Sequence, residues 1–165
     1  MKTSLMMNFS IDKENKKIHV EREFAAPAEN VWAAWTQPEL LDLWWAPRPW
    51  KTETRSMDFR VGGRWLYAMV GPDGTAHYCR ADYKSIDPQK SFSALDAFTD
   101  EKGNINENFP RSLWNNSFQG KGESTVVNVV ITYDKLEDLE KIIEMGFKEG
   151  FTMAMENLDE YFHSK

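Results

Sequence analysis

Alternating hydrophobic and polar residues run through two stretches of the chain and predict β-strands. Ile18, Val20 and Phe24 alternate with more polar neighbours, which gives one strand near the N-terminus. The same two-residue period fills residues 51–133, where glycine-containing turns such as residues 71–74 separate the alternating segments. About six consecutive strands joined by short turns predict an antiparallel meander.

Two short helices are expected between these stretches. Pro27 suits the first turn of a helix whose apolar side includes Trp35. A second helix runs through Trp44, and Pro47 forbids its continuation. Because Trp44 and Trp45 are adjacent, their side chains point about 100° apart on a helix. We expect one ring to face the core and the other to face the solvent edge or an entrance to the interior.

Residues 135–162 change to a helical period, which predicts one long amphipathic helix with one face toward the sheet. Gly146 and Gly150 lie near the middle of that face, where each costs about 1 kcal/mol relative to alanine. Close packing, a bend of the helix, or a hollow between helix and sheet would each offset this cost, and all three stay open. Phe147 and Phe151 form a neighbouring stripe, which is more often core than pocket lining.

The order of these elements defines the expected architecture. A strand, two short helices, a meander and a terminal helix predict an α+β fold. An antiparallel sheet has one apolar face to cover, and the terminal helix can cover it. We assign residues 1–17 to a polar N-terminal lead-in and residues 18–165 to a single domain, which suits the length of the chain.

Composition narrows the classes of partner. The net charge of −6 argues against nucleic acid, whose phosphates require a basic surface. No stretch approaches the ~20 consecutive apolar residues of a membrane span, so no membrane partner is expected. Cys79 is the only cysteine, which excludes an internal disulfide and fits a reducing compartment. We expect a cytoplasmic protein, monomeric or homodimeric, without a cofactor.

Motifs for catalysis are absent from the sequence. It contains no G-x-S-x-G, no H-E-x-x-H, no P-loop and no pair of cysteines. His19, His77 and His163 are too far apart in the sequence to argue for a metal site, so none is expected. His77 lies on an expected strand and could point inward as an acid or base, although a surface histidine is the commoner case. We therefore do not expect an enzyme, and keep a cyclase- or hydrolase-like activity as the least favoured alternative.

The segment from Arg22 to Pro47, "REFAAPAENVWAAWTQPELLDLWWAP", carries a family likeness. It resembles the opening of the branch of the START/birch-pollen-allergen (SRPBCC) superfamily that is named after the activator of heat-shock protein 90 (Hsp90) ATPase. The pieces that match are Pro27, Val31, Trp32, Trp35, Thr36, Pro38, Glu39, Leu40, Trp44 and Trp45. The later "DFRVGGRW" and "GPDG" segments agree in order and spacing. Val61 stands where the family often has proline, Phe151 where tryptophan is frequent, and residues 99–120 match no family motif.

The resemblance implies a helix-grip (Bet v 1-like, START-like) fold, in which a curved antiparallel sheet surrounds a long C-terminal helix and two short helices close one end. It also implies a cavity between sheet and helix that holds a small hydrophobic or amphipathic molecule. The residues that we expect to contact such a ligand are Trp45, Trp65, Tyr67, Met69, His77, Phe147, Gly150, Phe151 and Ala154. The alternative that the resemblance implies is a co-chaperone-type interaction with Hsp90.

Overall fold

The structure is a computed structural model that describes residues 6–164. These residues form a sheet of eight strands and four helices. The strands are β1 (Met7–Asp12), β2 (Lys17–Phe24), β3 (Lys51–Met57), β4 (Arg64–Val70), β5 (Ala76–Asp87), β6 (Ser91–Thr99), β7 (Ser112–Lys121) and β8 (Ser124–Tyr133). The helices are α1 (Ala28–Thr36), α2 (Pro38–Trp44), α3 (Leu136–Glu144) and α4 (Phe147–His163).

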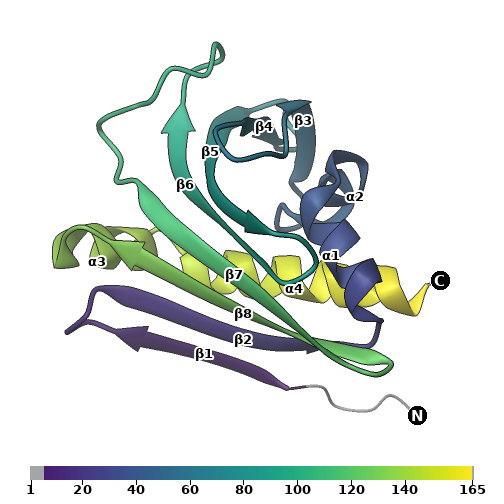
Figure 1. The fold of residues 1–165 in the computed structure, drawn as a ribbon. Coiled ribbons are helices and arrows are strands. Elements are labelled where there is room, and N and C mark those ends of the chain that lie inside the picture. The colour runs from purple at the N-terminus through teal and green to yellow at the C-terminus, as the bar shows by residue number, and fades with distance from the viewer. Residues whose placement is uncertain (1–5, 165) are drawn as a thin grey trace.

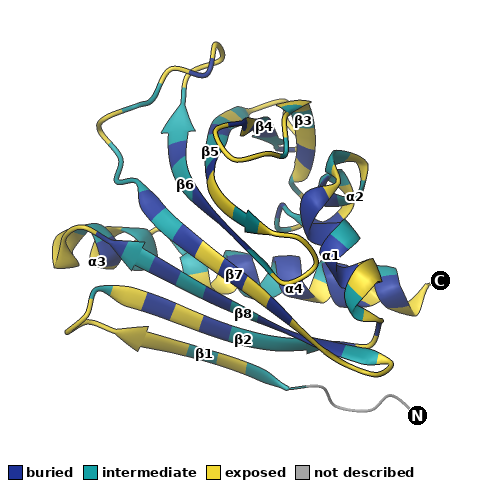
Figure 2. Cartoon of the chain, viewed as in Figure 1, coloured by how far each residue is buried: buried dark blue, intermediate teal, exposed yellow. Residues whose placement is uncertain are grey.

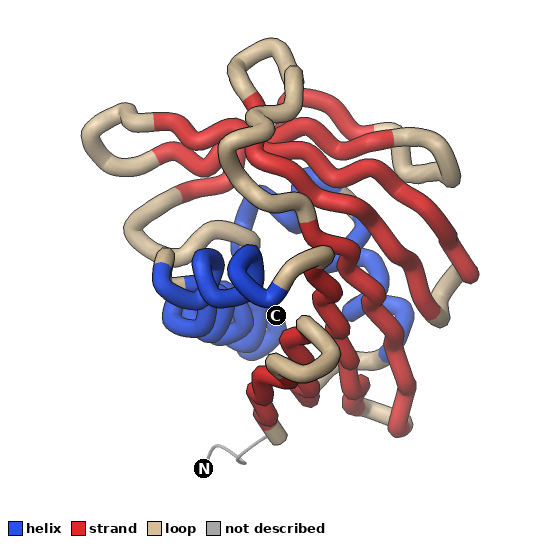
Figure 3. Tube along the Cα trace, turned by 90° about the vertical axis from the view of Figure 1, so that its left-hand side faces the viewer, coloured by secondary structure: helices blue, strands red, loops and turns tan. Residues whose placement is uncertain are grey.

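The sheet is entirely antiparallel and has the strand order β1-β2-β8-β7-β6-β5-β4-β3. It is a meander from β3 to β8, while β2 pairs with β8 and β1 pairs with β2 at the edge (Figure 1). Figure 3 shows the sheet curving over the helices, which lie on its concave side. The predicted α+β helix-grip fold is therefore confirmed.

Strand register determines which side chains reach the concave face. Trp65 on β4 lies opposite Ala81 on β5, which in turn lies opposite Asp96 on β6. Asp96 lies opposite Ser112 on β7, and Ser112 opposite Tyr133 on β8. Directly opposed residues share a face of an antiparallel sheet, so these five side chains form one row across its inner surface. Residues two positions further along each strand point to the same face and form the next row across the inner surface.

The helices α1 and α2 close one end of the sheet with buried tryptophans (Figure 2). Trp44 is buried, and its indole Nε1 donates a hydrogen bond to the carbonyl oxygen of Ala34, 2.9 Å away. The ring of Trp35 lies 4.9 Å from that of Trp44, centroid to centroid. The hydrogen bond and the ring contact hold α2 against α1, and the hydrogen bond satisfies the buried indole N–H.

The long C-terminal helix of the fold is α4, but the expected single helix over residues 135–162 is divided into α3 and α4. The helical period is interrupted at Gly146, whose φ of 91° is left-handed, so α3 ends at Glu144 and α4 begins at Phe147. Glycine adopts this conformation without a steric penalty, and it commonly ends a helix. A bend was one of the three explanations for these glycines, and it applies to Gly146.

The sheet also extends beyond the expected strands. Residues 7–12, which we placed in the lead-in, pair along β2 as an edge strand. Residues 1–5 of that lead-in lie outside the described residues. Part of the segment 99–120, which matched no motif, forms β7 between β6 and β8. No helix in the described part of the chain is long and apolar enough to cross a membrane.

Candidate functional site

A cavity of about 370 Å³ lies between the concave face of the sheet and the helices. Strands β4 to β8 form one wall of the cavity, and α2, α3 and α4 contribute to the opposite wall. Its lining is rich in aromatic residues: Trp35, Trp45, Trp65, Tyr67, Tyr83, Phe92, Phe98, Trp114, Tyr133, Phe147 and Phe151. The exposed side chains of His77 and Met145 also line it, so the cavity reaches the surface beside them.

Small residues explain why this space stays open. Ala81 and Ala94 lie on the inner face of the sheet on either side of Asp96, one across to β5 and one along β6. On the helix side, a Cβ atom placed on Gly150 would meet only Pro47, at 3.8 Å from its Cγ. Large rings surround these positions but do not fill the volume between them. Gly150 is therefore a place where the helix leaves room, rather than one where it packs closely.

Trp45 forms the wall at the α2 end. It is half-buried, and its Nε1 donates to the hydroxyl oxygen of Tyr67 at 3.1 Å. Its ring lies edge-on to that of Trp65 and tilted against that of Trp114, at centroid distances of 5.6 and 5.7 Å. The ring of Tyr67 stacks on Trp65 at 3.9 Å. Trp44 faces the core and Trp45 faces the cavity, as the spacing of these neighbours predicts.

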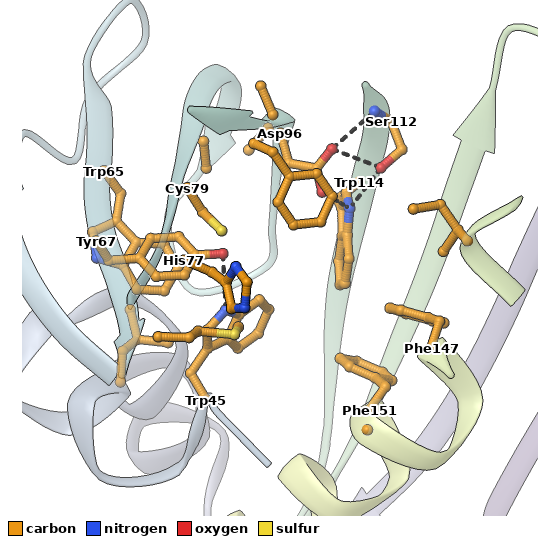
Figure 4. A pocket seen from close by; sticks show the side chains of 18 of the residues that line it. Trp45, Trp65, Tyr67, His77, Cys79, Asp96, Ser112, Trp114, Phe147 and Phe151 are labelled. Carbon is orange, nitrogen blue, oxygen red and sulfur yellow. Dashed lines mark hydrogen bonds between the residues drawn. The ribbon is translucent and has the colours of Figure 1, made fainter. Parts of the chain in front are cut away.

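Asp96 places a carboxylate in this aromatic surrounding (Figure 4). Its Oδ1 accepts hydrogen bonds from the backbone N–H of Ser112 at 2.8 Å and from the Ser112 hydroxyl at 2.7 Å. Its Oδ2 accepts one from Trp114 Nε1 at 3.0 Å. Burial raises the pKa of this carboxyl above its ordinary value, although the hydrogen bonds from Ser112 and Trp114 oppose the shift.

Burial disfavours the charged forms of two further groups on the inner face, the Tyr67 hydroxyl and the Cys79 thiol. Burial raises the pKa of Tyr67 well above its ordinary value, and the thiol of Cys79 and the charge of Asp96 raise it further. Burial likewise raises the pKa of the Cys79 thiol to about 12. A thiol with such a pKa is a poor nucleophile near neutral pH. No group of three metal-ligating side chains occurs among residues 6–164.

Eight of the nine residues expected to contact a ligand line the cavity, and their role as ligand contacts stays a prediction. They are Trp45, Trp65, Tyr67, Met69, His77, Phe147, Gly150 and Phe151. Ala154 lies outside this lining and is buried in the core, 1% exposed. His77 lies at the mouth, exposed, with its ring 5.2 Å from that of Trp50.

Sequence reasoning missed the polar groups of the cavity. Asp96 shares one strand face with Phe92, Ala94 and Phe98, which follow at two-residue steps. A single acidic residue on an otherwise apolar strand face was the available signal. Ser112 and Asn116 lie on β7, which the sequence did not reveal as a strand. Their inward direction could therefore not be inferred.

A curved sheet that grips a helix across an apolar cavity defines the helix-grip class, to which START and birch-pollen-allergen proteins belong. Residues 25–163 match the family described as Activator of Hsp90 ATPase homolog 1-like protein, and the chain belongs to that family. No functionally curated protein matches the chain.

Solved structures support the assignment along the whole fold. Protein Ms6760 from Mycobacterium smegmatis is 28% identical, with a TM-score of 0.88 over 98% of this chain and 99% of that one. A protein from Arthrobacter aurescens is 29% identical, with a TM-score of 0.88 over 92% of this chain and 88% of that one. Protein NE0264 from Nitrosomonas europaea shares the fold at 24% identity, with a TM-score of 0.79 over 93% and 97% of the two chains.

Proposed function

We propose that the protein binds a small hydrophobic or amphipathic molecule in the cavity between the sheet and α4. The observation that carries the proposal is a largely apolar space of about 370 Å³ with many aromatic side chains in its lining. Ligand pockets in proteins span about 300–1,000 Å³ and combine an apolar lining with a few placed polar groups. Asp96, Ser112 and Tyr67 are such groups here. Family membership supports this proposal at the level of the fold.

A fluorescence titration tests it with N-phenyl-1-naphthylamine, an uncharged probe that becomes bright in apolar surroundings. The variant Ala81→Phe places a ring inside the cavity, because Ala81 lies on the inner face beside Asp96. The control Asn115→Phe places the same ring on the exposed outer face of β7. We expect saturable binding by the unmodified protein and the control, and at least about tenfold weaker binding by Ala81→Phe. Equal binding by all three proteins would contradict the proposal.

A second proposal follows from the family name and the acidic net charge of −6: the protein contacts Hsp90 as a co-chaperone. Its test is a pull-down with purified Hsp90 together with a measurement of the Hsp90 ATPase rate. A rise in that rate, with binding, supports it. If neither binding nor a change of rate is seen, the co-chaperone proposal is rejected and the ligand proposal is unaffected.

A further inference from the structure

We propose that the ligand of this cavity is a monovalent organic cation, an amine or ammonium group on an apolar body, with the cationic group seated beside Asp96. This rests on the proposed function and adds the chemical class of the ligand. Three features support it: the charges of the lining, the surroundings of the carboxylate and the electrostatics of the aromatic rings.

The charge inside the cavity lining is negative. Among the described residues that line the cavity, Asp96 is the single carboxylate, and none is lysine or arginine. The lining histidine, His77, lies at the exposed mouth, away from the row that contains Asp96. A cationic ligand would therefore meet an opposite charge and no lysine or arginine inside, whereas an anionic ligand would meet the like charge of Asp96.

The surroundings of Asp96 leave space for a ligand atom. A carboxylate offers about four lone-pair sites. Ser112 supplies two donors and Trp114 supplies a third, so at least one site is unoccupied by the protein. Asp96 lines the cavity, and its neighbours Ala81 and Ala94 carry single methyl groups, which leave space beside the carboxylate. The carboxylate is thus accessible from inside the cavity.

The charge of Arg111 lowers the pKa of Asp96, but it acts from outside the cavity. Arg111 lies outside the lining, and its Nη2 donates to Asp82 Oδ2 at 2.6 Å. Its remaining bonds go to backbone oxygens: Nε to the carbonyl of Asp96 at 3.1 Å and Nη2 to that of Leu95 at 3.2 Å. The guanidinium is therefore bound to Asp82 and to the backbone, and a ligand cation can be the direct partner of the Asp96 carboxylate.

The aromatic walls favour the same ligand. Ring faces carry negative electrostatic potential and attract cations, most strongly in tryptophan and in sites without water. Trp114, whose indole is held by Asp96, lies 5.7 Å from Trp45 and 5.5 Å from Phe151, centroid to centroid. These rings come from β7, from the residue that follows α2 and from α4, and they converge on the cavity (Figure 4). A quaternary or protonated amine near Asp96 would meet both the carboxylate and these rings.

The test uses three probes of similar shape and different charge. They are benzyltrimethylammonium, its uncharged isostere neopentylbenzene, and phenylacetate, each measured by displacement of N-phenyl-1-naphthylamine. We expect the cation to bind at least about tenfold more tightly than the isostere. Phenylacetate should bind most weakly of the three. In Asp96→Asn the cation should fall to the level of the isostere, whose affinity should not change. The matched control Asp134→Asn removes a charge from an exposed position and should leave all three affinities unchanged.

The outcomes separate the two proposals. If the fluorescent probe binds but the isostere or phenylacetate equals the cation, the choice of a cation is wrong and the binding function stands. The choice of a cation is also wrong if Asp96→Asn folds and keeps the preference for the cation. If Asp96→Asn does not fold, the order of the three probes on the unmodified protein decides. If no probe binds, including the fluorescent one, both proposals fail.

Discussion

The two halves of α4 share one amphipathic pattern and have opposite surroundings. Residues 154–162 pack against a filled core, where Leu158 and Met155 are 0% and 1% exposed. Residues 147–151 lie over the cavity, and Phe147 stacks on Phe151 at 5.3 Å rather than entering the sheet. The difference teaches that a periodic apolar stripe shows which face of a helix turns inward. It does not show whether that face meets atoms or empty space.

The cause of the difference lies in the opposing strands. At the C-terminal half, the ring of Phe162 meets that of Phe24 at 6.0 Å, and Asp159 pairs with Arg22 at 3.6 Å. Large side chains on β2 therefore fill the space under the helix. At the N-terminal half the facing strands carry the small residues around Asp96, and the helix itself has Gly150. Volume missing on both sides of the interface produces the cavity.

The largest expected effect distinguishes the filled half from the hollow half. Leu158→Ala should lower the free energy of unfolding by about 2–5 kcal/mol, because it leaves a void in a packed core. Phe147→Ala removes a larger side chain, yet it should cost only about 1–2 kcal/mol, since this ring is half-buried beside an existing cavity. Urea denaturation of both variants measures the difference. Equal losses would mean that the two halves are packed alike.

Adding volume should show the same asymmetry between filled core and cavity, with smaller losses of stability. Val129→Phe enlarges a side chain that is 1% exposed on β8, and overpacking of this kind costs about 1–3 kcal/mol. Ala81→Phe should change the free energy of unfolding by less than about 1 kcal/mol, because the cavity accepts the ring. Thermal melts of both variants compare them. A loss of stability in Ala81→Phe as large as that of Val129→Phe would show that the space is already filled.

The sign of the pH dependence tests whether Asp96 is desolvated in the hollow region. Its pKa in the folded state is raised above the ordinary value of 3.8. The folded protein then binds this proton more tightly than the unfolded chain, so the contribution of Asp96 to stability is greatest at low pH and is lost as pH rises through the folded pKa. The Tm of the unmodified protein minus that of Asp96→Asn should therefore fall as the pH is raised above about 3.8. A constant or rising difference would indicate a solvated or ion-paired carboxylate.

The smallest effect concerns the reactivity of Cys79, which faces the hollow. Because its pKa is raised to about 12, alkylation by iodoacetamide near pH 8 should be roughly a hundredfold slower or more in the folded protein than in urea. The rate of modification, followed by mass spectrometry, gives the ratio. Rapid reaction of the folded protein would place the thiol in solvent instead of on the inner face of the sheet.

The parts of the fold with strong local patterns could be predicted, and the parts set by tertiary pairing could not. The alternation around Trp65 and Tyr67 gave both the strand and its inward face. Strand β7 was not predicted, because polar residues lie on both of its faces. Asn115 points outward and Asn116 points inward, so hydrophobic and polar residues do not alternate cleanly. The break at Gly146 was one of three interpretations of the same glycine pattern, since a positive φ cannot be distinguished in sequence from a position of close packing.

For the site, the sequence predicted the aromatic wall and missed its polar centre. Trp45 was expected to contact the ligand because the side chains of adjacent helical residues, Trp44 and Trp45, point in different directions. Asp96 could be placed on an apolar strand face, but its partner Ser112 lies across a strand pairing that only the fold creates. Ala154 was assigned to the ligand because its helical spacing matches Gly150. The structure separates the two, since the cavity ends before the middle of α4.

The most direct test of a ligand-binding cavity is a crystal structure of the protein grown with N-phenyl-1-naphthylamine. We predict density for the probe between Asp96 on the sheet and Phe147 and Phe151 on α4, with Gly150 facing it. The cavity is contradicted if these walls are in mutual contact, with the side chains of Trp45 and Trp114 filling the space and no density between them.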